Sequence, residues 1–202
     1  MSESSPTQKT GLQEPIWTIP NIMSVGRLLA AGFILWAIDT GMWDTALVLF
    51  ALAAISDWFD GYIARRFNQG TVLGRQLDPL VDKIVVIAVL VHLAALPGSG
   101  VRPWMVSVIL TRELIIQALR SQLESASVGF GAKMAGKLKM TIQCFAIVAV
   151  LFVFRQGGAE SSADGLVLLR DVLIYAAIFL TIYSGAAYLV QAKAIFEKGI
   201  SA

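Results

Sequence analysis

Six long apolar stretches, separated by short polar connections, dominate the pattern of hydrophobic and polar residues along the chain. They cover residues 22–40, 43–64, 79–97, 103–124, 139–155 and 170–190. Most are close to the roughly 20 residues that an α-helix needs to cross the hydrocarbon core of a membrane. The pattern therefore predicts an all-α integral membrane protein with six transmembrane helices.

The remaining segments predict one membrane domain with a polar tail. Residues 1–13 are polar and are expected to be a disordered tail, whereas residues 14–202 are expected to form the single domain. Trp17 stands between Pro15 and Pro20, which is typical of a short interfacial segment that lies on the membrane. Residues 155–169 are rich in Gly, Ser and acidic residues and predict an exposed connection.

Composition and charge agree with this interpretation. Of the 202 residues, 56% are hydrophobic and only 15% are charged, which excludes an ordinary soluble domain. Lys and Arg gather after the second and fourth apolar stretches, and since basic residues accumulate on the cytoplasmic side, both termini are expected there. The net charge of +2 is too small to indicate binding of nucleic acid. Cys144 is the only cysteine, which excludes an intrachain disulfide.

Four carboxylates lie in or beside two neighbouring apolar stretches. Asp57 and Asp60 are three residues apart and Asp78 and Asp82 are four apart, so each pair shares one face of a helix. Ionisable residues at membrane depth are costly and indicate a function. Four converging negative charges repel one another unless cations lie between them, and hard oxygen ligands favour Mg²⁺ or Mn²⁺. The sequence therefore predicts two divalent cations that clamp the oxygens of a displacement at phosphorus.

Each of these residues taken alone also has a structural interpretation. Asp78 before Pro79 can cap a helix, and Gly61 and Ala64 can let two helices pack closely. Taken together, they match the ordered pattern D-x2-D-G-x2-A-R-x8-G-x3-D-x3-D at every specified position. The matching residues are Asp57, Asp60, Gly61, Ala64, Arg65, Gly74, Asp78 and Asp82. On this pattern the chain resembles the CDP-alcohol phosphotransferase family.

This resemblance implies roles for the matching positions. It implies that Asp57, Asp60 and Asp78 bind metal, and that Asp82 both lies near the second metal and acts as general base. It implies a CDP-diacylglycerol site made by Asn21, Ser24, Arg27, Gly61, Ala64, Arg65, Thr71 and Gly74. The family also implies a homodimer with separate active sites.

A second group of polar residues lies in the fourth and fifth apolar stretches. Arg112 and Arg120 are eight residues apart, so they project to similar sides of a helix, and Glu113 cannot neutralise both. Lys137 and Lys139 open the fifth stretch on the same predicted side of the membrane. Together the four cations predict a binding pocket for the phosphate of an acceptor. For Arg120, Lys137 and Lys139, snorkelling to the membrane surface is the alternative.

Longer segments narrow the resemblance to the bacterial phosphatidylglycerophosphate synthases. These segments read IPNIMSVGR, DWFDGYIARR, REL..QALR and GK.K.T, within a similarity that covers roughly residues 18–155. They imply transfer of phosphatidyl from CDP-diacylglycerol to glycerol 3-phosphate, with release of CMP, in the cytoplasmic membrane of a bacterium.

Two alternatives stay open. The eight-position pattern describes only the donor half of the reaction, so inositol phosphate or serine could be the acceptor instead. A divalent-cation transporter would also use intramembrane carboxylates, but it gives no reason for the fixed spacing of Gly61, Ala64, Arg65 and Gly74.

Overall fold

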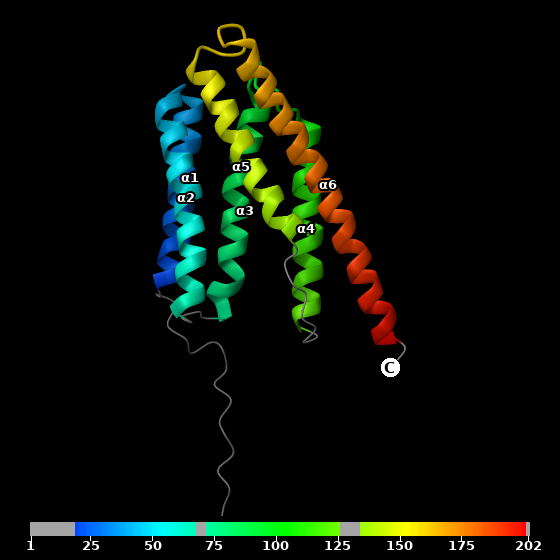
Figure 1. The fold of residues 1–202 in the computed structure, drawn as a ribbon. Coiled ribbons are helices and arrows are strands. Elements are labelled where there is room, and N and C mark those ends of the chain that lie inside the picture. Colours follow the sequence, from blue (N-terminus) through cyan, green and yellow to red (C-terminus); the bar gives the residue numbers. More distant parts are fainter. Residues whose placement is uncertain (1–18, 68–71, 126–133, 201–202) are drawn as a thin grey trace, which may run out of the picture.

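The computed structural model describes the backbone of residues 19–67, 72–125 and 134–200, and the side chains of 25–56, 83–122 and 136–195. Within these residues it contains six α-helices and no strand. The helices are α1 (Ile19–Asp39), α2 (Trp43–Phe67), α3 (Val72–Ala95), α4 (Pro103–Ser125), α5 (Met134–Arg155) and α6 (Asp164–Ile200), as Figure 1 shows. The predicted all-α fold is confirmed.

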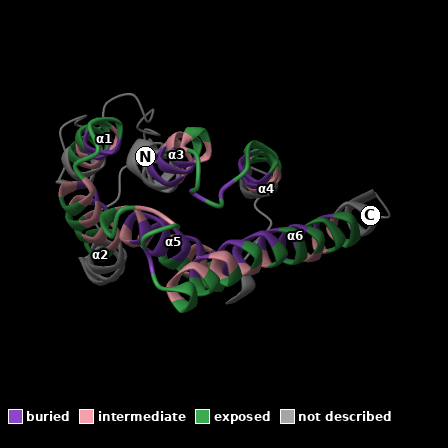
Figure 2. Cartoon of the chain, turned by 90° about the horizontal axis from the view of Figure 1, so that it is seen from above, coloured by how far each residue is buried: buried purple, intermediate pink, exposed green. Residues whose placement is uncertain are grey.

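The helices form two layers of three. Seen from above, α1, α3 and α4 follow one another along one side, while α2, α5 and α6 do so along the other (Figure 2). Neighbours within each layer are in contact, and the layers are joined by the pairs α1–α2, α3–α5 and α4–α6. The arrangement encloses a space between α3, α4, α5 and α6 in which side chains from all four helices can meet.

Successive helices run in opposite directions, so the connections alternate between the two ends of the bundle. The connections 40–42, 96–102 and 156–163 lie at one end, at the top of Figure 1. The end of α2, the start of α3, the end of α4 and the start of α5 all lie at the other end. The two predicted sites therefore belong to the same end of the molecule.

The helices extend beyond the apolar stretches. Helix α2 continues to Phe67 and α3 begins at Val72, so the eight-position pattern falls on helical backbone. The expected connection over residues 155–169 is wrong in its second half, because α6 begins at Asp164. An acidic residue in the first turn stabilises a helix through its dipole, and Gly165 is tolerated there. The Gly, Ser and acidic residues of this stretch gave no indication that a helix begins within it.

Two helices carry segments that are long and apolar enough to cross a membrane. These are Gly136–Arg155 in α5 and Asp164–Ile195 in α6, while Trp43–Ser56 and Lys83–Ala95 are shorter apolar segments within the described residues. Helix α6 also turns large apolar side chains outward, among them Leu168, Phe179 and Val190. Exposed apolar surface of this extent is typical of a protein that lies in lipid. The chain is a membrane protein, and six complete crossings remain a prediction.

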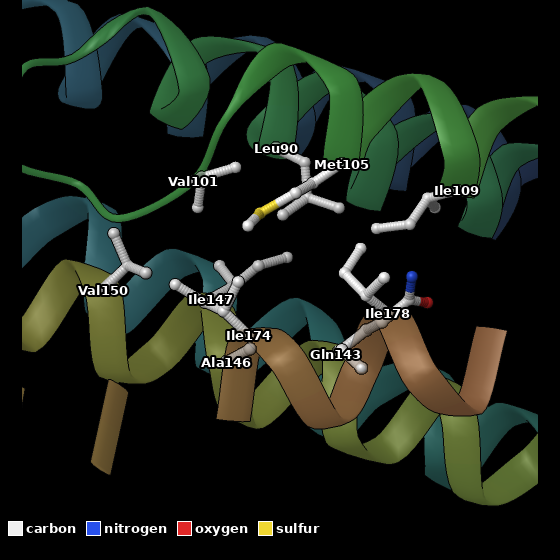
Figure 3. Close-up of a pocket in the computed structure, with 11 residues that line it drawn as sticks. Leu90, Val101, Met105, Ile109, Gln143, Ala146, Ile147, Val150, Ile174 and Ile178 are labelled. Atoms are coloured by element: carbon white, nitrogen blue, oxygen red, sulfur yellow. The ribbon is translucent and has the colours of Figure 1, made fainter. Parts of the chain in front are cut away.

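The apolar core lies between the two layers. Its fully buried side chains include Ile34, Phe50, Leu93, Met105 and Ile147. A small cavity of about 20 Å³ lies among α3, α4, α5 and α6, lined by apolar residues and by Gln143 (Figure 3). In lipid, such a core gains van der Waals contact rather than exclusion of water, so polar contacts between helices contribute more to their registration.

One such polar contact ties α6 to the connection between α3 and α4. Arg170 is buried, donates from Nη1 to the carbonyl oxygen of Gly98 at 2.7 Å, and pairs with Asp171 at 2.8 Å. Gly100 has a φ of 77°, and a Cβ placed on it would lie 3.0 Å from Oδ1 of Asp171. The close approach of this connection to α6 therefore requires glycine.

Candidate functional site

The four predicted metal ligands occupy helical positions at matched depths. Asp57 and Asp82 each lie ten residues from the facing helix ends, Phe67 and Val72, which is about 15 Å along a helix axis. Asp60 and Asp78 lie seven and six residues from the same ends, about 10 Å along the axis. Only residues 68–71 join the two helices, so Asp57 and Asp82 occupy positions at similar depth, and so do Asp60 and Asp78.

The side chains of these aspartates lie outside the described residues, and so do those of Asn21, Ser24, Ala64, Arg65 and Thr71, while Gly61 and Gly74 are described only as helical backbone. Among the side chains that the structure does describe, no group of three or more His, Cys, Asp or Glu could hold a metal ion. Four carboxylates at paired depths are a donor set that suits two hard divalent cations. The metal site accordingly stays a prediction from sequence and helix position.

A second cavity is well described at this end of the bundle. It has a volume of about 230 Å³ and lies between α3, α4, α5 and α6. The residues that line it include all four predicted phosphate ligands: Arg112, Arg120, Lys137 and Lys139. The structure thus brings together cations that the sequence could group only by their position near one membrane surface.

Glu113 lies at the centre of the charged wall of this cavity. Its side chain is only 7% exposed, and Oε1 accepts a hydrogen bond at 2.9 Å from Nη1 of Arg112. The ammonium of Lys139 donates to the same oxygen, and that of Lys83 lies 3.6 Å from Oε2. Lys83 also donates to Oε1 of Gln117 at 2.6 Å. One buried carboxylate therefore holds cations from α3, α4 and α5 in place.

The cavity keeps a strong positive charge after this pairing. Five cationic side chains and one carboxylate line it, which leaves a formal surplus of four positive charges. Three buried donor nitrogens on its walls have no hydrogen-bond partner among the described residues: Nε of Arg112, Nε of Arg120 and Nε2 of Gln143. Buried donors without partners are costly. The surplus of positive charge therefore suits the cavity to an anion.

The predicted phosphate ligands differ in their surroundings. Lys137 is exposed, and Arg112 and Arg120 are partly buried, whereas Lys139 is only 4% exposed and is engaged with Glu113. Lys139 therefore lines the cavity and adds positive charge to it, but its ammonium is already bonded to Glu113. Of the residues predicted to bind CDP-diacylglycerol, Arg27 is the only one whose side chain is described, and it does not line this cavity.

Sequence reasoning missed several lining residues. Lys83 directly follows Asp82, so its place at the start of an apolar stretch could have marked it as a cation beside the predicted base. Gln143 and Tyr188 stand in apolar stretches with no pattern around them, and no local signal distinguishes them. Their place in the lining is visible only because α6 packs against both α4 and α5.

Comparison with known proteins agrees with the predicted chemistry. A family model described as CDP-alcohol phosphatidyltransferase matches residues 17–183, which is most of the chain. The chain belongs to the CDP-alcohol phosphatidyltransferase family. The resemblance first seen in the eight-position pattern is thereby confirmed. Because this is a family of enzymes, the match counts against the alternative of a divalent-cation transporter.

Several curated relatives of this family member carry the name CDP-diacylglycerol–glycerol-3-phosphate 3-phosphatidyltransferase. The protein from Cereibacter sphaeroides is 40% identical over 145 residues, which cover 68% of this chain and 64% of the relative. That from Rickettsia bellii is 33% identical over 181 residues, covering 88% and 97%. That from Bacillus subtilis is 36% identical over 141 residues, covering 70% and 69%.

Proposed function

We propose that this phosphatidyltransferase transfers the phosphatidyl group of CDP-diacylglycerol to glycerol 3-phosphate, which gives phosphatidylglycerophosphate and CMP. The shared name of the relatives supports the reaction. The observation that carries the choice of acceptor is the cationic cavity, whose lining has a formal surplus of four positive charges.

The cavity favours an acceptor that carries a phosphate. Arg112 and Arg120 would bind the phosphate of glycerol 3-phosphate through charge-assisted hydrogen bonds, and Lys137 would approach it from the exposed rim. Gln143 would donate to a further oxygen of the acceptor. Serine has no phosphate to offset the surplus positive charge, so it suits the cavity poorly. Inositol phosphate shares the phosphate and remains the alternative that the experiment must separate.

The aspartate helices would supply the reacting end of the site. Asp57, Asp60, Asp78 and Asp82 would hold two divalent cations, Mg²⁺ or Mn²⁺, which when bound would offset the charge of the carboxylates and of the donor diphosphate. Asp82 would accept the proton of the acceptor 1-hydroxyl as it attacks the β-phosphorus in line with departing CMP.

The position of Asp82 supports its role as base. It directly precedes Lys83 on α3, and the side chain of Lys83 lines the acceptor cavity. The backbone of Asp82 therefore lies beside this wall, which supports a place for Asp82 near the hydroxyl of an acceptor whose phosphate lies against Arg112.

The donor would bind beside the same helices. The nucleotide part of CDP-diacylglycerol would contact Asn21, Ser24, Arg27, Gly61, Ala64, Arg65, Thr71 and Gly74, and the acyl chains would stay in lipid. This assignment rests on the family resemblance and on the helical positions of α2 and α3.

Six crossings with both termini on the cytoplasmic side of the bacterial inner membrane complete the proposal. The cavity end of the bundle carries most of the basic residues, whereas the opposite end has Arg102, Arg155 and Arg170. An excess of Lys and Arg marks the cytoplasmic side. A homodimer with separate active sites is proposed from the resemblance alone.

The deciding experiment measures CMP release by the purified protein in detergent, with CDP-diacylglycerol and Mg²⁺ or Mn²⁺. Glycerol 3-phosphate, inositol 1-phosphate, inositol and serine are offered separately, and the lipid product is identified by mass spectrometry. The proposal expects phosphatidylglycerophosphate with glycerol 3-phosphate only. CMP release with a different acceptor would overturn the acceptor assignment, and no release with any of them would overturn the reaction.

A further inference from the structure

A short segment of helix α6, outside the aspartate and arginine motifs, lies against Arg112, and one of its residues lines the acceptor cavity. The segment contains Ser184, Gly185 and Tyr188, and it begins one residue beyond the part of the chain that the family model matches. We propose that these three are positioning residues that hold Arg112 in the orientation needed to bind the acceptor phosphate. The inference rests on the proposed function and assigns to α6 a part in the recognition of the acceptor.

Hydrogen bonds fix the two terminal nitrogens of Arg112. Nη1 donates to Glu113 at 2.9 Å on the same helix, and Nη2 donates to Oγ of Ser184 at 3.0 Å across the layers. Ser184 is fully buried, and its hydroxyl donates in turn to the backbone oxygen of Thr181 at 3.2 Å. Each terminal nitrogen thus has a protein acceptor, while Nε has none among the described residues. The guanidinium has a defined orientation on the cavity wall.

Arg112 also packs closely against the backbone of Gly185. A Cβ placed on Gly185 would lie 3.0 Å from Cγ of Arg112 and 3.7 Å from its Nε. Because Cγ is near the base of the side chain, it cannot move away without shifting the guanidinium. Glycine at this position is therefore what allows the arginine to lie against α6.

Tyr188 completes the support from the other side. Its ring centroid lies 5.5 Å from Cζ of Arg112, within the range of a cation–π contact. A Cβ placed on Gly136 would lie 3.5 Å from the Tyr188 hydroxyl oxygen, so this side chain reaches from Arg112 on α4 to the start of α5. Tyr188 is 2% exposed and lines the cavity. Ser184, Gly185 and Tyr188 therefore all contact Arg112, each in a different way.

The test compares two substitutions with matched controls on the same helix. Ser184→Ala removes the acceptor for Nη2 of Arg112, and Thr181→Val removes another buried α6 hydroxyl, which donates within its own helix to the oxygen of Ala177. Gly185→Ala crowds Arg112, whereas Gly165→Ala adds a Cβ with nothing within 4 Å.

The measurement is the KM for each substrate and kcat. A hydrogen bond to a charged group contributes enough that Ser184→Ala should raise the KM for glycerol 3-phosphate by about 10-fold. Gly185→Ala should raise it in the same direction. The KM for CDP-diacylglycerol should stay unchanged for both, and the controls should behave as wild type. An unchanged KM for glycerol 3-phosphate, or an equal rise for both substrates, would overturn the inference.

A double substitution distinguishes positioning from general packing. If Ser184 acts through Arg112, its replacement by Ala should have little further effect on acceptor affinity in an Arg112→Lys background. Independent, additive effects would refute the inference. For a variant without turnover, protection from thermal unfolding by glycerol 3-phosphate replaces KM as the measure of affinity. Wild-type protein that makes no phosphatidylglycerophosphate would instead refute the proposed function, whatever the α6 variants do.

Discussion

Glu113→Gln is the substitution that most directly tests how the acceptor cavity is held together. The change keeps the size of the side chain but removes the only negative charge among the described residues that line the cavity. Arg112 then keeps an oxygen acceptor, while Lys139, with its side chain 5% exposed, and Lys83, at 22%, lose their counter-ion. Three cations from three helices would repel one another across the space that the carboxylate now fills.

The magnitude follows from the burial of this group. Removing one partner of a buried ion pair costs about 3–5 kcal/mol, because the remaining charge is left without compensation. We expect a loss of about 3 kcal/mol in the free energy of unfolding, since the amide oxygen of glutamine still accepts one hydrogen bond. In lipid the apolar helix contacts provide little exclusion of water, so a loss of this size should be visible in the stability of the whole bundle.

The assay is unfolding in mixed micelles, followed by helicity as the denaturing detergent is increased. Glu160→Gln is the matched control, because Glu160 is exposed in the connection between α5 and α6, and a substitution there should change stability by less than about 0.5 kcal/mol. Adding Lys139→Met to Glu113→Gln removes the stranded buried charge and should restore part of the loss. A Glu113→Gln change as small as the control, or a double variant no more stable than the single one, would refute this reasoning.

The remaining predictions concern catalysis and the opposite end of the bundle. Arg112→Ala should raise the KM for glycerol 3-phosphate far more than that for CDP-diacylglycerol, and equal changes would argue against the phosphate pocket. Asp82→Asn should retain the fold by circular dichroism yet lose turnover, so near-normal activity would remove it from the role of base. Chelation of divalent cations should abolish CMP release and readdition should restore it, whereas activity that persists in chelator contradicts the metal site. Gly100→Ala should lower the thermal stability more than Gly98→Ala, since both have positive φ but only the former crowds Arg170 and Asp171; equal effects would show that backbone strain alone matters.

Much of the fold could be predicted from local patterns. Apolar stretches of membrane-spanning length gave six helices, and the spacing of three and four residues assigned each aspartate pair to one helix face. The errors lie at helix ends, as at Asp164, where helix capping and composition give opposing signals. Arg112 is predicted to be a phosphate ligand because a cation at that depth requires a partner, which is also a local argument.

The sequence by itself determined the helices and the family and predicted the residues for the chemistry, because periodicity and motif spacing are properties of neighbouring residues. Only the tertiary structure decided which partners these residues have. Glu113 meets Lys83 and Lys139 from two other helices, and Ser184 meets Arg112 across 72 positions of the chain. Such contacts depend on which helices pack together and at what depth, and no periodic pattern within a single helix specifies that.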